Sequence, residues 1–506
     1  MFIPSISNMT PDEILRKRPF TRLLPPGDIP AGGSAYMQGD LSSGYAEREL
    51  RYELLSQGDF LMELDQNSHK IMSDTYYPDP VTYDAKKKQY FKRKVARVTV
   101  NLPEIFANQR TSMLTGSDTD LKLMVGGQSE KMQDLLSLYS EGWAYKNMEV
   151  AKYELVYNNG IVGDAAILFY LNGGEVGWTA LSYKNGDILY PHYDPYGKIA
   201  LFGRKYRREE KGKMKTYLDV YDNTFHVRYR EATEDDRKTG RTGWVVDSEP
   251  TPHRFPRVPV AYVRYGEPFF AGAMNDVNNI ELALSQLCEN NKHYALRILT
   301  AFGADLQVQA TLDGRPTQIN SPDPNARVGY LEPADSSGSF ELQLRTLIKN
   351  AYQAAHCVES PELKSGSDVS SLTVQMLYAD VYHKSLNDAK VFQAGLDDIV
   401  ELFRHGWAIE TGKLSEFDPA KFRVKGTMHP YIMKSENEEV NNIAILSNSG
   451  GLPRKAVANE SYKLGYGTPR NYEDLLQEEH DALTGEAAAP ATTPQGTTVN
   501  ESRNQG

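Results

Sequence analysis

Apolar residues in the C-terminal half of the chain recur with helical spacing. Steps of three and four residues across 275–302 predict one long helix that ends before Gly303. The same spacing predicts a second helix over 339–358. A seven-residue apolar repeat predicts a third helix over 372–410, roughly 58 Å long. Because an ordinary helix has about a dozen residues, this third helix indicates an element that spans a large assembly.

The stretch from about residue 158 to 266 has the pattern of β-strands instead. Short segments rich in Tyr, Val and Ile alternate with turn residues at intervals of roughly 8 to 12 residues, which predicts an antiparallel domain. Asn172-Gly173 and Asn185-Gly186 have the residue types of tight turns. The glycine-rich stretch 158–164 matches no phosphate-binding loop, so we interpret it as a further hairpin turn.

The two ends of the chain differ from this middle part. We expect an irregular arm over 1–60, because clustered Pro, Gly and Ser prevent a long helix there. The last residues, 482–506, hold almost no large apolar side chain and are expected to be disordered. Further predicted elements are helices over 102–116 and 130–156, a strand over 421–433 and a group of helices over 435–481.

Composition narrows the class of protein. The 506 residues are 40% hydrophobic and 24% charged, values typical of a globular protein. Two cysteines are too few for a secreted disulfide framework, no run of about 18 apolar residues is present, and the start lacks a signal-peptide core. We therefore expect a reducing compartment and no membrane. A net charge of -11 argues against a protein that grips nucleic acid, but not against one past which DNA slides.

Candidate catalytic and metal-binding groups are weak. His192, Tyr193 and Asp194 are explained by a turn, and His253 has no metal-ligand companion at helical spacing. No serine lies in a nucleophile elbow, and Cys357 follows His356 within the predicted helix rather than facing a separate base. We expect no enzyme activity, no cofactor and no metal site. Two acidic clusters are interpreted as solvated helix faces: Asp397, Asp398 and Glu401, and Glu436, Glu438 and Glu439.

The order of the predicted elements resembles the portal proteins of tailed double-stranded-DNA bacteriophages, in particular the siphophage-type family. The segment 157–194 is similar to the family's glycine-then-strand segment, and 218–231 to its paired strands. A Val-Pro-Val strand within 253–268 leads into 274–293, as it does before the family's first stem helix. The segment 441–483 is similar to the family's C-terminal helices. Each motif is weak alone, but their common order over about 60 to 480 is specific.

The resemblance implies an α+β portal-type fold with a β-rich wing, a two-helix stem, a small α/β clip, a long helix behind a tunnel loop and a helical crown. The implied divisions are an N-terminal arm over 1–60, a wing over 61–271, a first stem helix over 272–302, a clip over 303–338, a second stem helix over 339–358, a segment over 359–434 that holds the tunnel loop, the long helix and a return strand of the wing, a crown over 435–481 and a disordered tail over 482–506.

The resemblance also implies a function. Such proteins form a ring of about twelve subunits at one capsid vertex, through which double-stranded DNA passes during packaging and ejection without sequence-specific contacts. The implied partners are the large subunit of the terminase motor, the head-tail adaptor, and the major capsid and scaffold proteins. The protein would be assembled in the host cytoplasm and reside in the virion.

Two groups of residues are candidates for contact with DNA. Cations and a histidine of the stem helices are candidates for the channel wall, although ordinary solvated positions explain them equally well. Small, flexible residues with one cation are candidates for the tunnel loop. The stem candidates are Lys292, His293, Arg297, Arg345 and Lys349, and the tunnel-loop candidates are Lys364, Ser365, Gly366, Ser367 and Asp368.

A basic run near the N-terminus is a third candidate. Its cations are interleaved with Tyr90 and Phe91, a composition compatible with nucleic-acid binding. We favour a solvated helix face, or a contact with an acidic capsid or scaffold protein. The run comprises Lys86, Lys87, Lys88, Lys92, Arg93, Lys94 and Arg97.

Two other classes of protein remain open at this point. Another ring-forming head or tail protein of a virion would oligomerise without needing a long stem helix. A carbohydrate-active hydrolase would use paired acids and some of the 31 tyrosines. The hydrolase predicts a monomer with a pocket, so the oligomeric state separates it from both structural alternatives.

Overall fold

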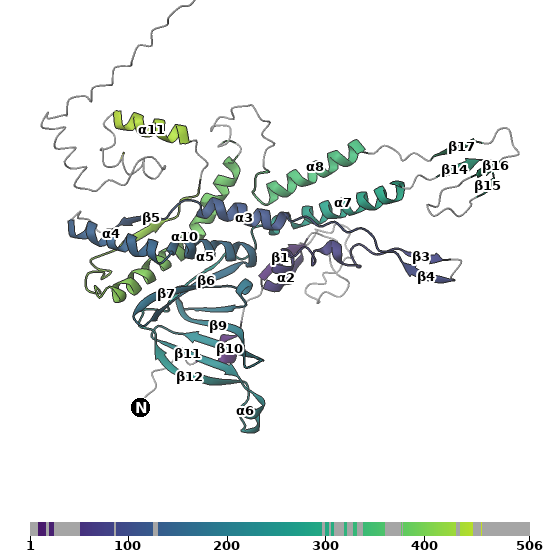
Figure 1. Cartoon of the computed structure of the whole chain (residues 1–506). Coiled ribbons are helices and arrows are strands. Elements are labelled where there is room, and N and C mark those ends of the chain that lie inside the picture. The colour runs from purple at the N-terminus through teal and green to yellow at the C-terminus, as the bar shows by residue number, and fades with distance from the viewer. Residues whose placement is uncertain are drawn as a thin grey trace, which may run out of the picture. The chain divides into compact units, whose positions relative to one another are not determined.

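The computed structural model contains both helices and sheets (Figure 1). The chain divides into two compact units, one of Met1–Ser365 with Leu377–Tyr431 and one of Gly366–Met376 with Ile432–Gly506. Helix α11 (Glu436–Asn448) belongs to the second unit, and the other elements below belong to the first. The residues described are 9–16, 20–24, 51–84, 88–124, 130–295, 299–302, 305–307, 318–320, 327–330, 337–359, 376, 378–431, 436–448 and 457.

The predicted β-rich segment forms two antiparallel sheets. One has five strands in the order β12-β11-β10-β9-β8, and the other has three in the order β13-β6-β7. The turn between β6 and β7 uses Gly173 and Gly174, both at positive φ, as the sequence predicted. The strands are β6 (Asp164–Asn172), β7 (Glu175–Leu181), β8 (Ile188–Tyr193), β9 (Ile199–Glu210), β10 (Lys213–Tyr221), β11 (Phe225–Glu231), β12 (Trp244–Pro252) and β13 (Val260–Arg264).

Six longer helices accompany these sheets in the described part of the first unit. They are α3 (Leu102–Thr115), α4 (Glu130–Tyr145), α5 (Met148–Val162), α7 (Met274–Ala295), α8 (Ser337–Ala354) and α10 (Ala379–Glu410). The shorter ones are α1 (Pro11–Ile14), α2 (Gln57–Met62), α6 (Glu234–Lys238), η1 (Lys70–Met72), η2 (Tyr183–Asn185) and η3 (Ala271–Ala273). Among the helices of the described residues, none is long and apolar enough to cross a membrane.

Five two-stranded pairs complete the fold. They pair β1 (Phe20–Leu24) with β2 (Arg51–Leu55), β3 (Val81–Asp84) with β4 (Gln89–Lys92), β5 (Asp120–Leu123) with β18 (Val424–Thr427), β14 (Leu299–Phe302) with β17 (Arg327–Tyr330), and β15 (Asp305–Gln307) with β16 (Gln318–Asn320). All five are antiparallel. The last two pairs lie in the segment that connects α7 to α8.

The largest hydrophobic core lies where α10 packs on the three-stranded sheet. Phe403 makes edge-to-face contacts with the rings of Tyr139 and Trp143 from α4. Close approach of α10 requires glycine, since a Cβ at Gly395 would lie 2.3 Å from Val263. Of the seven-residue repeat seen in the sequence, Val400 and Trp407 are buried on this side of α10, whereas Leu386 is exposed.

Three predicted helix boundaries are wrong. The helix expected over 130–156 is two helices, because Asn147 has a left-handed backbone conformation (φ 54°, ψ 46°). The helix expected over 275–302 ends at Ala295, since 299–302 pair as a strand. The helix expected from residue 372 begins at Ala379, because Tyr378 is its N-cap.

Other local predictions are also wrong. Residues 158–162 of the glycine-rich stretch are the last turn of α5, not a hairpin turn, and the second stem helix ends at Ala354 rather than 358. The arm 1–60 contains regular structure: α1, β1, β2 and part of α2. Within it, Ile14 is buried against the five-stranded sheet and its carbonyl faces Nε2 of His192 at 2.9 Å. A short apolar contact thus orders a segment that local composition predicts to be irregular.

Candidate functional site

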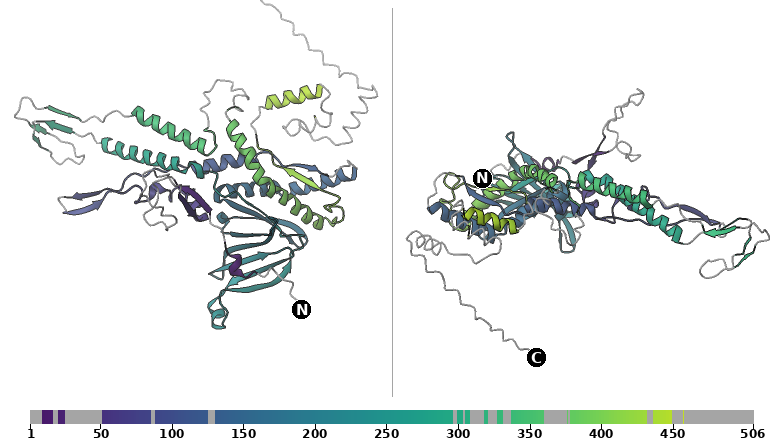
Figure 2. Two further views of the ribbon diagram at one scale, coloured as in Figure 1. Left: turned by 180° about the vertical axis from the view of Figure 1, so that it is seen from behind. Right: turned by 90° about the horizontal axis from the view of Figure 1, so that it is seen from above.

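Helices α7 and α8 form an antiparallel pair that projects from the sheets, and they run side by side in every view (Figures 1 and 2). The base of the pair is apolar. Val277 and Ile280 of α7 and Ala351 of α8 share a core with Phe106 of α3, and Phe106 meets the ring of Tyr352 edge-to-face at 5.1 Å. The two helices predicted as a stem are therefore paired on each other and rooted on α3.

Three of the proposed channel-wall cations lie exposed on this helix pair. Lys292 is near the end of α7 and its Nζ lies 3.9 Å from Glu289. Arg345 of α8 pairs with Glu341 at 2.8 Å, and Lys349 is exposed on the same helix. Two of these cations face an acid of their own helix, which offsets part of their positive charge.

The remaining candidates cannot be placed in the same way. His293 belongs to α7. Arg297 and the five tunnel-loop candidates, Lys364, Ser365, Gly366, Ser367 and Asp368, lie outside the described residues.

The predicted basic run is a β-hairpin, not a helix face. Lys86 and Lys87 lie outside the described residues. Lys88 lies in the turn before β4, Lys92 lies on β4, and the remaining cations lie on the extended segment that follows. Arg93 pairs with Glu289 of α7 at 2.7 Å, and Arg97 contacts Asp79 at 3.1 Å. Part of the positive charge is therefore used inside the subunit.

The extended segment 93–100 is bound to α7 by a ladder of hydrogen bonds. Three of its backbone N–H groups donate to side chains of α7: Ala96 to Glu289 at 2.9 Å, Val98 to Ser285 at 2.8 Å and Val100 to Glu281 at 3.0 Å. The spacing follows from elementary geometry, because four helical residues rise about 6 Å and two extended residues span about 6.6 Å. The sequence feature that could have indicated this contact is the spacing of the acceptor side chains at 281, 285 and 289. That spacing becomes informative only once the extended segment is known to lie beside α7.

A buried His–Glu pair completes this ladder. Nδ1 of His69 lies 2.6 Å from Oε1 of Glu281, and Nε2 lies 3.0 Å from the carbonyl of Glu63. A neutral imidazole has one donor and cannot serve both acceptors, so the His69–Glu281 pair holds an extra proton. Burial by itself lowers the pKa of His69, but the hydrogen bond to Glu281 and the charge of that carboxylate outweigh it, and the pKa of His69 is raised.

This pair predicts a pH dependence of stability. The pKa of folded His69 lies above its usual value of 6.5, so its stabilisation is complete below that pH and is lost as the pH rises through the folded pKa. We expect the free energy of unfolding to fall over that range, and His69→Gln to remove this fall. Urea unfolding across the pH range measures it. His383→Gln, at an exposed position of α10, should leave the fall unchanged, and an unaltered pH profile in His69→Gln would contradict the assignment.

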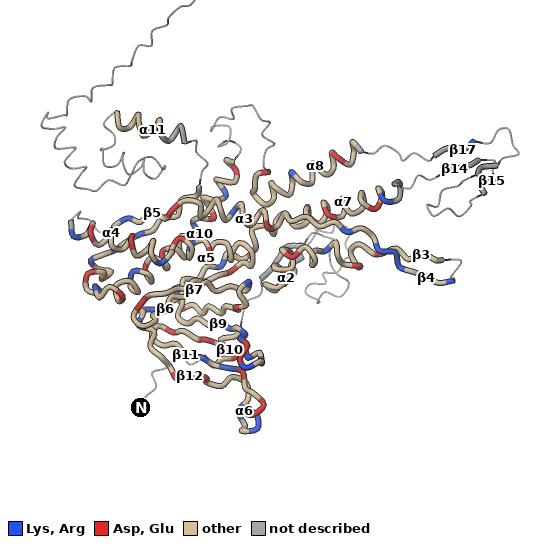
Figure 3. The backbone as a smooth tube through the Cα atoms, viewed as in Figure 1, with Lys and Arg blue, Asp and Glu red and all other residues tan. Residues whose placement is uncertain are grey.

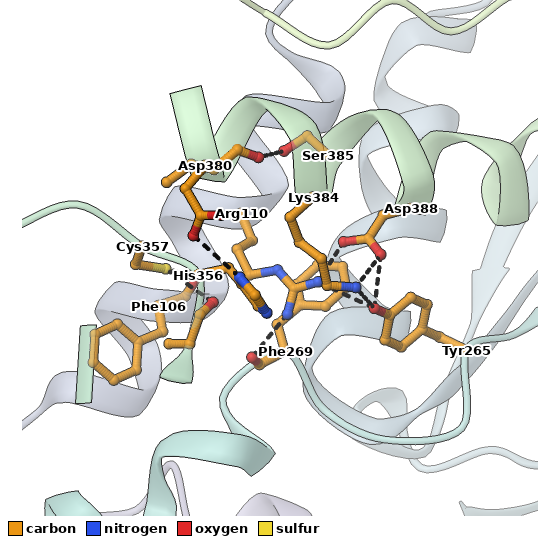
Figure 4. Close-up of polar contacts among 12 residues, drawn as sticks. Phe106, Arg110, Tyr265, Phe269, His356, Cys357, Asp380, Lys384, Ser385 and Asp388 are labelled. Carbon is orange, nitrogen blue, oxygen red and sulfur yellow. Dashed lines mark hydrogen bonds and ion pairs between the residues drawn. The ribbon is translucent and has the colours of Figure 1, made fainter. Parts of the chain in front are cut away.

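A second buried network joins α3, α10 and the chain between β13 and α7 (Figure 4). Arg110 of α3 pairs with Asp388 of α10, and its Nη1 donates to the carbonyl of Phe269 at 2.9 Å. Tyr265 donates its hydroxyl to Asp388 at 2.8 Å, and Lys384 reaches the same carboxylate at 2.6 Å. Burial raises the pKa of Asp388, but the Arg110 charge and these hydrogen bonds more than offset that effect and lower it.

Helix α3 also contacts the chain on both sides of the segment 360–375. The side-chain amide of Gln109 exchanges two hydrogen bonds with the backbone of Val358, at 2.8 and 2.9 Å. Val358, Met113 and Val381 share a small core, so the chain before residue 360 and the start of α10 meet on α3. The carbonyl of Met113 in addition accepts the N–H of Tyr431.

The other candidate groups have structural partners. Arg257 pairs with Asp398 at 2.8 Å and with Glu401 at 3.3 Å, and burial raises the pKa of Asp398. Cys357 lies beyond the end of α8, not within it as predicted, and burial raises the pKa of its thiol to about 12. Within the described residues no group of three or more potential ligands could hold a metal ion.

The comparison with known protein families identifies the family of the chain. Residues 52–463, well over half of the chain, match the family model of phage portal proteins of the SPP1 Gp6-like type. The chain belongs to this portal protein family. Its members are structural proteins of the bacteriophage virion that act in genome packaging, and the resemblance noted in the sequence is confirmed. No curated protein sequence matches the chain.

The Arg110–Asp388 pair leads to a prediction for this portal protein. Asp388→Ala leaves Arg110 and Lys384 without their carboxylate in a buried site, so we expect the free energy of unfolding to fall by about 3 to 5 kcal/mol. Denaturant unfolding measures it.

A matched control lies on the same helix. Asp380 has a side chain that is 79% exposed, and Asp380→Ala should cost no more than about 0.5 kcal/mol. Equal losses for the two variants would show that the buried network does not hold α10.

Proposed function

We propose that this portal protein forms a ring of about twelve subunits at one capsid vertex, with a central channel for double-stranded DNA during packaging and ejection. The observation that carries the proposal is the family match over 52–463, a range that includes α7, α8 and α10. In this proposal α7 and α8 are the stem, 303–338 the clip, 360–371 the tunnel loop, and 435–481 the crown. The clip docks the terminase large subunit and later the head-tail adaptor, while outer surfaces contact capsid and scaffold proteins.

The charge of the chain supports a conduit rather than a clamp. With a net charge of -11 per subunit, a ring is strongly electronegative overall. Each phosphate neutralised by a cation would add salt-dependent affinity and so retard a moving duplex. A few exposed cations on the stem, two of them facing nearby acids, suit weak contacts with the phosphate backbone that carry no sequence information.

The channel assignment is tested by removing two of its cations together. Lys292→Ala combined with Lys364→Ala should reduce the DNA packaged and retained per particle several-fold, because both lysines are proposed to face the duplex. Packaging assays with particles built from the variant chain measure this. Lys198→Ala, at the exposed turn between β8 and β9, is the control. Unchanged packaging and retention would remove the channel residues from the proposal.

A further inference from the structure

The β3–β4 hairpin exposes apolar side chains on both of its faces. The exposed fractions are 59% for Val81, 50% for Tyr83, 75% for Tyr90 and 47% for Phe91. Tyr83 and Tyr90 are direct cross-strand partners, and their ring centroids lie 5.0 Å apart. A two-stranded hairpin is at best marginally stable alone in water, and clustered exposed apolar side chains mark interaction sites. The hairpin therefore needs a partner surface.

The hairpin is held in a fixed direction despite this exposure. The segment that leaves β4 is the one bound along α7 by the hydrogen bonds of Ala96, Val98 and Val100. All views show the hairpin beside the α7–α8 pair and pointing the same way (Figures 1 and 2). A preformed orientation lowers the entropy that must be lost on binding.

The exposed charge on the hairpin and the segment after it is positive, as the blue stretch in Figure 3 shows. Lys88, Lys92 and Lys94 are all exposed. Lys92 lies 3.6 Å from Asp74, and both side chains are more than half exposed, so this contact neutralises little. We call the residues 81–84 and 88–94 the basic hairpin.

A surface of opposite charge and similar apolar character lies on α3 and α5. Val150, Tyr153 and Tyr157 share one face of α5, since they follow each other at steps of three and four residues. The rings of Tyr153 and Tyr157 stack with centroids 5.6 Å apart. Val150 and Tyr153 are exposed, as is Ile105 on α3.

Two carboxylates flank these rings. Burial, Tyr153 and then the charges of Glu104 and Glu154 raise the pKa of Tyr157. Nζ of Lys184 lies 4.5 Å from the centroid of the Tyr157 ring, so two carboxylates and one cation border the stacked pair. Glu104 is exposed, and Glu154 is half-buried with its carboxylate accepting from Asn158 at 2.8 Å. We call this surface the acidic aromatic face, and it comprises Glu104, Ile105, Val150, Tyr153, Glu154 and Tyr157.

We propose that the basic hairpin of one subunit docks on the acidic aromatic face of the next copy of this chain. We infer a second copy of this chain as the partner from complementarity, because each surface carries exposed aromatic and aliphatic groups and the two surfaces have opposite charge. It also follows from symmetry. Two different surfaces that bind each other form a heterologous, head-to-tail contact, and such contacts form a ring where the rotation between neighbours closes. The inference rests on the proposed ring and names one of its subunit contacts.

A charge exchange tests the contact. Lys92→Glu with Lys94→Glu on the hairpin should abolish the ring species in mass measurements, and so should Glu104→Lys with Glu154→Lys on the face. Combining all four substitutions should restore it, because the charges are again opposite. Lys198→Glu with Lys213→Glu, exposed lysines of the β8–β9 turn and of β10, should leave assembly unchanged. Melting temperatures equal to wild type would show that each variant folds.

A cross-link tests the pairing directly. Tyr90→Cys together with Tyr153→Cys should give a ladder of oxidised dimers, trimers and higher species, whereas each single variant should remain a monomer on a denaturing gel. Dimers alone from a single variant would indicate a symmetric contact and overturn the inference.

The outcomes separate this inference from the proposed function. If rings form normally in both charge-reversed variants, or are not recovered in the combined variant, the proposed contact is wrong. The proposal that the wild-type chain forms a ring is unaffected by either result. If the variant with Lys92→Glu and Lys94→Glu assembles normally but no longer binds a duplex DNA fragment, the hairpin is a nucleic-acid surface and the proposed subunit contact is wrong. A wild-type chain that stays monomeric at high concentration contradicts the ring itself.

Discussion

One buried guanidinium, that of Arg110, holds together the parts of the subunit that must keep a fixed geometry. It pairs with Asp388 of α10 and donates to the carbonyl of Phe269, two residues before η3, the 3₁₀ helix that leads into α7. A charge in such a place is tolerated only when it is fully paired, so the network is satisfied in one arrangement of α3, α10 and the root of α7. Helix α10, which packs on the three-stranded sheet, and the root of α7 are therefore linked through Arg110 of α3.

The direction of the α7–α8 pair is set by that network and by the extended segment 93–100, which is bound along α7. A helix pair that projects from a domain has few neighbours, and α7 gains one in the segment 93–100 through Glu281, Ser285 and Glu289. The same segment carries the basic hairpin, so the position of the hairpin is coupled to α7. In the ring that we propose, a displacement of one stem would then reach the contact with the next subunit.

Sequence patterns predicted what depends on local chemistry. The α3 helix, the antiparallel strands and the Gly173-Gly174 turn follow from periodicity and turn residues, whereas the pairing of α7 with α8 was implied by the family resemblance. The errors come from one local backbone conformation and from long-range contacts. Asn147 breaks a helix through its backbone conformation, and the apolar pattern of 299–302 serves a strand that pairs with 327–330. Arg110 and Gln109 have no local signal, because their partners are more than 150 residues away.

The central claim is that this chain is a portal subunit whose α7–α8 pair faces a channel. Electron microscopy of the purified protein, combined with its mass, tests that claim most directly. The account predicts a closed ring of roughly 0.7 MDa for about twelve subunits, with a central hole lined by α7 and α8. A monomer, an open filament, or a ring with this helix pair on its outer rim would contradict it.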